Sequence, residues 1–192
     1  MRLGIAHHYG WAVAVTATDE HRVVDRRRIE LIEPGHPTAP IHHEGGAYDM
    51  HSSGKLLSDD ELAELVAEVR SSVEGSIETA FNELAHSLAA PVRSISLRAW
   101  PEGFPSGIAE LRKPPFDSQA DSVMYRQLMA DAAQRRGWVV HRFDGATAEG
   151  RASELLGPRA EEVLRGPRRT LGPPWNRDHR MALAATVLAS IE

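Results

Sequence analysis

The sequence predicts an α/β protein built on a mixed five-stranded sheet with helices on its faces. Three apolar runs separated by short turns occupy residues 2–32, and this spacing is typical of an antiparallel meander. A long stretch with helical periodicity follows, and two later apolar runs are each followed by further helical segments. Helical crossovers join strands in parallel, so the predicted order is β-β-β-α-β-α-β-α.

Length and composition limit the protein class. The 192 residues suit one domain, 1–192, with a long irregular loop at 33–57 that is rich in proline, glycine and histidine. No apolar run approaches the roughly 20 residues that span a bilayer, and the start lacks a secretory signal, so we expect a cytoplasmic protein without membrane contact. The absence of cysteine excludes disulfides, thiolate metal sites and cysteine nucleophiles.

The predicted elements can be placed one by one. Strands are expected at 2–6, 11–18 and 22–32 because apolar residues alternate with small or polar ones. Ser58 and Glu61 form a capping-box pattern, and the long helix that they begin carries a continuous apolar stripe and ends before Pro91. The remaining predicted elements are a strand at 92–100, a helix capped by Asp117 or Ser118 and ending at Arg136, a strand at 138–143, short helices within 147–164, a loop at 166–175 and a last helix capped by Asn176.

This order resembles the ribonuclease H-like superfamily, and it is most similar to the Holliday-junction resolvases. The segment LGIAHHYGWAVAV is similar to the first hairpin of that family, and NRDHRMALAATVLA is similar to its last helix. The resemblance covers nearly the whole chain. It implies a nuclease-like fold in which several carboxylates hold two divalent metal ions that activate water against a phosphodiester.

The sequence departs from that pattern where the family carries its carboxylates. The first is expected on the first strand, where this chain has Ala6 and His7, and another is expected within 97–100, where no acid occurs. Asp178, followed by His179, is the counterpart of the acid on the last helix. A site of His7, His8 and Asp178 would suit zinc, manganese or nickel better than magnesium, which prefers oxygen ligands.

Two interpretations of the histidine pair stay open. One of His7 and His8 projects toward Asp178 as a metal ligand or general base, or both cap a turn between two strands. Adjacent residues on a strand point to opposite faces, so at most one contributes to a site if the strand continues through them. Asp178 and His179 are the catalytic candidates; in the alternative, Asp178 is an acid placed by the helix dipole.

Other clusters are open to the same choice. The loop residues His42, His43, Glu44 and His51 either bind a metal or form a solvated loop. Small basic clusters lie at 26–28, 135–136 and 165–169, and the net charge of -5 disfavours strong non-specific binding. Two arginine pairs, Arg168 with Arg169 and Arg177 with Arg180, either contact nucleic-acid phosphates at the end of the sheet near the last helix or form a solvated basic face.

Two functions follow as hypotheses. The first is a divergent, non-catalytic binding or scaffold module linked to nucleic acid. The second is a metal-dependent phosphodiester hydrolase with His and Asp ligands, for which a divalent metal would be the cofactor. A further hypothesis is that the exposed acidic helix pairs two copies of the chain into a homodimer.

Overall fold

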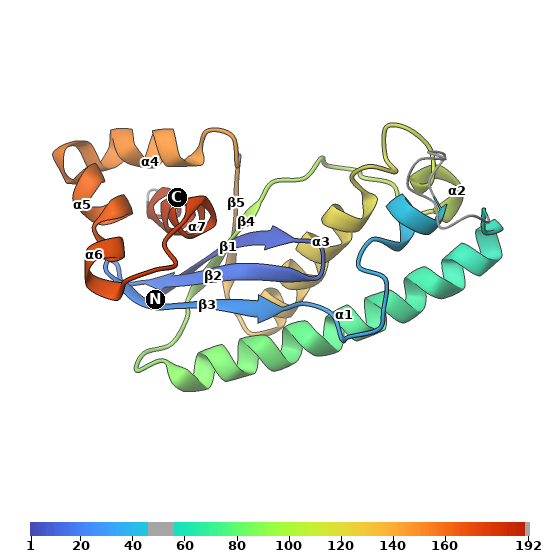
Figure 1. Cartoon of the computed structure of the whole chain (residues 1–192), viewed down its shortest axis with the longest axis horizontal. Helices are drawn as coiled ribbons and strands as arrows, with labels where there is room; N and C mark the ends of the chain where they lie inside the picture. The colour runs from blue at the N-terminus through green and yellow to red at the C-terminus, as the bar shows by residue number, and fades with distance from the viewer. Residues whose placement is uncertain (46–55, 191–192) are drawn as a thin grey trace.

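The computed structural model describes residues 1–45 and 56–190 and contains a central five-stranded sheet with strand order β3-β2-β1-β4-β5 (Figure 1). β1, β2 and β3 form an antiparallel meander, whereas β4 pairs in parallel with β1 and β5 pairs in parallel with β4. The predicted mixed sheet is therefore confirmed. The strands are β1 (Arg2–His8), β2 (Trp11–Ala17), β3 (Val23–Glu30), β4 (Ser94–Arg98) and β5 (Val139–Phe143).

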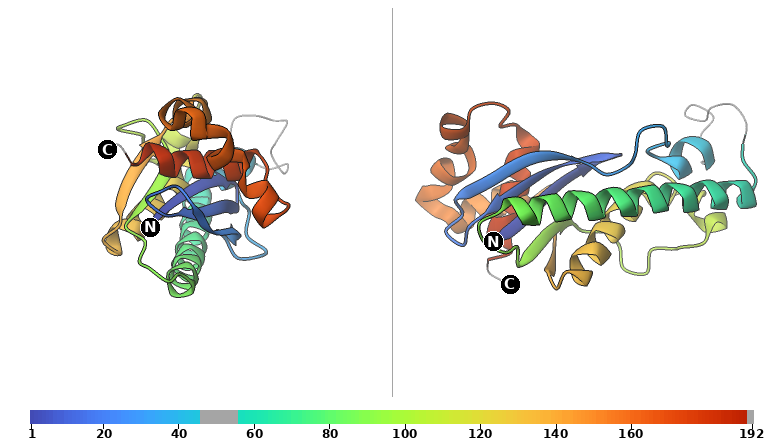
Figure 2. Two further views of the ribbon diagram at one scale, coloured as in Figure 1. Left: turned by 90° about the vertical axis from the view of Figure 1, so that its left-hand side faces the viewer. Right: turned by 90° about the horizontal axis from the view of Figure 1, so that it is seen from below.

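Helices cover both faces of this sheet. Figure 2 shows the sheet between α7 on one side and the long helix α1 on the other, with α3 beside α1. The described helices are α1 (Asp59–Ser87), α2 (Ile108–Leu111), α3 (Ala120–Arg135), α4 (Ala148–Leu156), α5 (Ala160–Arg165), α6 (Pro167–Leu171) and α7 (Arg177–Leu188), with short turns η1 (Ile41–Gly45) and η2 (Gly157–Arg159). No helix in the described ranges has the length and apolar character to cross a membrane.

The alternation of side chains along β1 divides the core into two layers. Leu3 and Ile5 are buried against α1 and α3, and Ala6 is buried in the cluster that contains α7. Gly4 faces α7 so closely that a Cβ would overlap the carbonyl oxygen of Ala182. This strand therefore has no room for a side chain where the last helix crosses it.

Helix α1 begins as predicted. Ser58 Oγ accepts a hydrogen bond from the Glu61 N–H at 3.2 Å, and the Ser58 N–H donates to Glu61 Oε2 at 2.8 Å, which completes the capping box. Farther along, Glu78 pairs with Arg135 and Arg136 of α3, and hydrogen bonds from Arg136 and then Arg135 lower the pKa of Glu78 to about 2. One predicted basic cluster thus joins the two helices.

Besides shifts of one or two residues at the strand ends, three segments differ from the predictions. The segment expected as a loop at 166–175 contains α6, because Pro167 fixes a helical φ at the first position of a short helix. The irregular stretch at 33–57 includes η1. Helix α3 begins at Ala120 without a side-chain cap, since the Asp117 carboxylate is buried and accepts a hydrogen bond from the adjacent Ser118 N–H at 2.9 Å.

Candidate functional site

The carboxyl ends of the adjacent central strands β1 and β4 meet the beginning of α7. This edge of the sheet is formed by strand ends and not by a terminal strand. The two strands lie side by side in parallel, with Gly4 opposite Ser96. Ser96 Oγ donates to the Ala185 carbonyl at 3.1 Å, which holds α7 against β4, while the absence of a side chain at Gly4 lets the helix approach β1. The first strand and the last helix, which carry the candidate histidines and Asp178, are therefore neighbours.

A histidine and a carboxylate form a pair at this edge. His8 Nε2 lies 3.2 Å from Asp178 Oδ2, and the two side chains are 43% and 21% exposed, so solvent and ligands can reach both. The His8 ring stacks on the Trp11 indole with 4.1 Å between centroids, and the Arg28 guanidinium lies 4.1 Å from the same ring. Stacking on Trp11 and the hydrogen bond with Asp178 together fix the orientation of the His8 imidazole.

His7 lies on the other side of the sheet. Burial lowers its pKa to about 3, and the positive charge of Arg126 on α3 acts in the same direction. Its imidazole is therefore neutral at physiological pH. The structure brings together His8 and Asp178 but separates His7 from them, as alternation along an extended strand requires.

His179 caps the helix that carries Asp178. The buried His179 places Nδ1 2.7 Å from Asn176 Oδ1, while the Asn176 side chain also accepts from the backbone N–H groups of residues 178 and 179. Burial lowers the pKa of His179, and the charge of Arg26 adds to that shift. The imidazole therefore orients the first turn of α7 and is turned toward the cap.

Arg26 holds the chain that leads into this helix. Its guanidinium donates to the Leu171 carbonyl at 2.7 Å and to the Gly172 carbonyl at 2.9 Å, and it also contacts the carbonyls of Pro173 and Pro174. Four backbone carbonyls thus converge on one side chain of β3. This contact positions Asn176 and Asp178, and the sequence offered no local signal for it, because the partners lie more than 140 residues apart.

Three arginines from β4, α3 and β5 lie around the end of β4, where the family resemblance places a carboxylate. Arg98 continues the face of Ser96, and its side chain passes so close to Gly145 that a Cβ there would lie 3.2 Å from Arg98 Nε. Arg126 reaches across from α3 and donates to the Ala99 carbonyl at 2.5 Å. Arg142 of β5 stacks 3.9 Å from the Trp100 ring centre. The family pattern concerns carboxylates only, so it does not point to these arginines in the sequence.

The acid that follows β5 is already hydrogen-bonded to its own loop. Asp144 follows β5, and its carboxylate accepts hydrogen bonds from the Ala146 N–H at 2.9 Å and the Thr147 hydroxyl at 3.1 Å. Within residues 1–45 and 56–190, no three histidine, aspartate or glutamate side chains are placed to hold one metal ion. The donor set at this edge therefore does not fit the carboxylate-bound pair of metals that the family resemblance implies.

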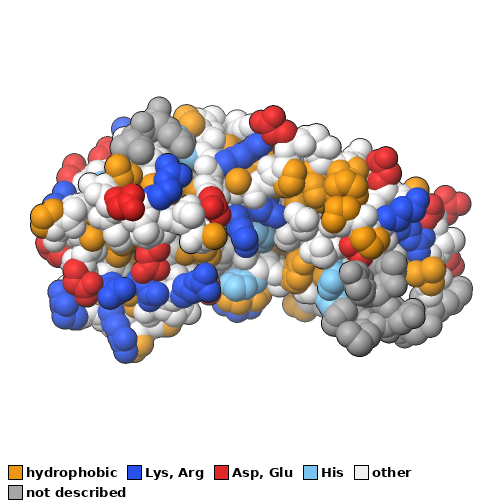
Figure 3. Space-filling view, turned by 90° about the horizontal axis from the view of Figure 1, so that it is seen from above, with side chains coloured by type: hydrophobic (Ala, Val, Ile, Leu, Met, Phe, Trp, Pro, Cys, Tyr) orange, Lys and Arg blue, Asp and Glu red, His pale blue; other side chains and the backbone are white. Residues whose placement is uncertain are grey.

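The arginine clusters differ in whether their side chains are already paired with acids. Arg27 pairs with Asp25 at 2.7 Å, Arg28 pairs with Glu30 at 2.6 Å, and the pair at 135–136 binds Glu78. In contrast, Arg168 and Arg169 on α6 are exposed and form no ion pair within the described residues. Figure 3 shows Lys and Arg side chains along one margin of the α4–α6 end and extending toward the middle of this face, where histidines are exposed.

The histidine-rich loop forms a separate feature. The completely buried Asp121 of α3 accepts hydrogen bonds from the backbone N–H groups of Ile41 at 3.1 Å and His42 at 2.9 Å. These bonds pin η1, which carries His42, His43 and Glu44, to the start of α3. Burial raises the pKa of Asp121 to about 6. His51 lies outside the described residues.

Among the comparisons with known proteins, the one with solved structures identifies the fold. No protein-family model matches the sequence, and no curated protein matches it. Among solved structures, the chain is similar to T. thermophilus RuvC in complex with a Holliday junction substrate, with a TM-score of 0.52, 13% sequence identity, and coverage of 97% of this chain and 89% of RuvC. The mixed sheet and its helices therefore share the fold of RuvC, which confirms the predicted ribonuclease H-like arrangement.

Proposed function

We propose that this chain is a non-catalytic nucleic-acid-binding module that contacts phosphate groups at the edge where β1 and β4 end and α7 begins. The observation that carries the proposal is Arg98, an exposed guanidinium on the strand end and face where the resolvase pattern calls for a metal-binding carboxylate. A guanidinium repels divalent cations and binds phosphate oxygens in a bidentate manner. A guanidinium in place of a carboxylate therefore favours binding of the nucleic-acid backbone over its hydrolysis.

Further contacts support a phosphate-binding edge. Within the described residues, the Arg98 guanidinium forms no ion pair, so its donors are available to a ligand. On the opposite face of the same sheet, Arg142 presents its guanidinium on the Trp100 ring, an arrangement of a cation and an aromatic plane that suits a nucleic-acid strand. The fold neighbour RuvC is described with a Holliday junction, which makes branched DNA the first ligand to test.

The binding proposal is tested with the full chain and fluorescein-labelled DNA. Anisotropy titrations over a salt series compare a four-way junction, a duplex and a single strand. Arg98→Gln should weaken binding about fivefold to tenfold and reduce the slope of log affinity against log salt by about one. The matched control is Arg70→Gln, because Arg70 lies on α1 on the opposite face of the sheet and forms no ion pair within the described residues. Equal affinities of the two variants, or no binding of any DNA at low salt, would contradict the proposal.

The pair of His8 and Asp178 supports a second candidate, a metal-dependent phosphodiester hydrolase. A carboxylate 3.2 Å from an imidazole nitrogen can orient that imidazole as a base or share a metal ion with it. Incubation of labelled junctions with Mg²⁺, Mn²⁺ or Zn²⁺ distinguishes the two functions. Products that form with wild type and disappear with both His8→Ala and Asp178→Asn would establish the hydrolase and overturn the non-catalytic proposal.

A further inference from the structure

The strand β3 leaves one edge of the sheet without a partner. It is the terminal strand in the order β3-β2-β1-β4-β5. The Leu31 N–H donates to the Gly10 carbonyl at 2.8 Å and therefore points toward β2. Because backbone groups alternate along a strand, the N–H and C=O groups of Arg28 and Glu30 point away from β2. No group in the described ranges forms a hydrogen bond with them, so this edge can accept another strand.

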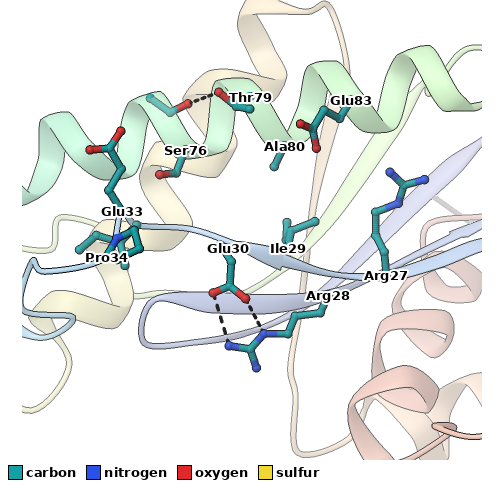
Figure 4. Close-up of a pocket in the computed structure, with 12 residues that line it drawn as sticks. Arg27, Arg28, Ile29, Glu30, Glu33, Pro34, Ser76, Thr79, Ala80 and Glu83 are labelled. Atoms are coloured by element: carbon teal, nitrogen blue, oxygen red, sulfur yellow. Dashed lines mark hydrogen bonds and ion pairs between the residues drawn. The ribbon is translucent and has the colours of Figure 1, made fainter.

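A groove runs between this edge and α1. It has a volume of about 450 Å³, and the side of α1 that faces it carries small residues, including Gly75, Ser76 and Ala80. Figure 4 shows Ser76 and Ala80 on the side of the helix toward β3, with Ala80 above Ile29, while Arg28 and Glu30 form a pair on the opposite side of β3. A Cβ at Gly75 would meet no atom within 4 Å, so a second element can approach the helix here.

We propose that this edge pairs with the same edge of a second copy of the chain, through an antiparallel β3–β3 contact whose two-fold axis passes beside Ile29. In that register Arg28 lies opposite Glu30 of the second copy, and Glu30 lies opposite Arg28 of the second copy. The outward backbone groups of each such pair face one another and form a hydrogen-bonded pair, and the side chains share one face of the combined sheet. The contact is isologous, as a two-fold dimer requires.

Charge selects this register over its neighbours. A shift of the partner by two residues in one direction sets Arg28 opposite Arg28, and the same shift in the other direction sets Glu30 opposite Glu30. Like charges directly opposite each other destabilise an antiparallel pair. The other edge strand of the sheet has no such pattern, because pairing β5 about His141 would set Arg142 opposite the apolar Val140.

The combined sheet would bring the two α1 helices to the same face. Their small residues beside the groove would then line the two-fold axis, where two backbones can approach more closely than large side chains allow. The groove, which the buried Ile29 lines, lies on the α1 side of the contact, and the charged pairs on the opposite face supply the register. These features together distinguish a self-complementary edge from an ordinary exposed strand.

Sedimentation of the full chain over a concentration series tests the pairing by charge reversal. Wild type should form a species of twice 21.1 kDa. Arg28→Glu sets acids opposite one another across the axis and should weaken the dimer at least about tenfold, because like-charge contacts at an interface are costly. Glu30→Arg should do the same, and the double variant Arg28→Glu/Glu30→Arg should restore the wild-type affinity. Circular dichroism of each variant establishes that it is folded.

A cysteine cross-link gives a second, independent test because the chain contains no cysteine. In a non-hydrogen-bonded pair on the axis, the two Cα atoms lie about 4.5 Å apart, within the range of a disulfide. Ile29→Cys should therefore form a disulfide-linked dimer, whereas Val24→Cys, an exposed position on the same strand, should do so much more slowly. A wild type that remains monomeric at every concentration, or a dimer that all these variants leave unchanged, would overturn the proposal.

Discussion

Asp121 makes a quantitative prediction about the pH dependence of stability. Its carboxylate is completely buried, accepts two backbone N–H groups of η1, and has a pKa raised by burial from 3.8 to about 6. A shift of about two units corresponds to about 3 kcal/mol, since each unit is worth about 1.4 kcal/mol. Because the folded pKa is the higher one, the charged form opposes folding: this cost is fully present above pH 6 and disappears as the pH falls through 3.8.

The substitution Asp121→Asn isolates this effect. At pH 7 it should change the free energy of unfolding little, because relief of the buried charge is offset by one backbone N–H that loses its acceptor, at a cost of about 1–3 kcal/mol. Between pH 7 and pH 4, wild type should gain about 2–3 kcal/mol of stability relative to the variant. The lowered pKa of His7 destabilises both proteins equally in acid, so it cancels in the difference.

Urea unfolding at pH 7 and pH 4 measures this difference directly. Asp131→Asn, an exposed position on the same helix, is the matched control and should retain the wild-type pH profile. If wild type and Asp121→Asn show the same pH dependence, the Asp121 carboxylate is not desolvated in solution and the reasoning fails.

Two further predictions concern the approach of α7. Arg26→Gln removes the guanidinium shared by the carbonyls at 171–174 and should lower the free energy of unfolding by about 2 kcal/mol. The expected result is a fall in Tm of about 4–8 °C and faster amide exchange at the start of α7. An unchanged Tm and exchange rate would show that the contacts of Arg26 with these carbonyls are dispensable. Gly4→Ala should cost about 3 kcal/mol by thermal unfolding, because its Cβ would overlap the Ala182 carbonyl. The control Gly150→Ala lies in open space on α4 and should stabilise by about 0.5–1 kcal/mol, and equal effects of the two alanines would contradict the close packing of β1 on α7.

The sequence by itself predicted features that depend on neighbouring residues. The Ser58 and Glu61 pattern located the start of α1, and Asn176 located the start of α7, because a helix cap is made within a few residues of chain. Alternation along the first strand also predicted that only one of His7 and His8 could face Asp178. The mixed sheet followed from the order of the elements along the chain and the rules for their connection.

The tertiary structure decided which charges are available. Arg26, Arg28 and Arg136 look alike in the sequence, yet one holds a distant loop, one stacks on Trp11 and one joins two helices. Arg98 remains exposed on the same face as Asp178 because the parallel register of β4 with β1 places its end there. The physical reason is range: periodicity and caps are set by adjacent residues, whereas the partner of a side chain depends on strand register and helix packing over the whole chain.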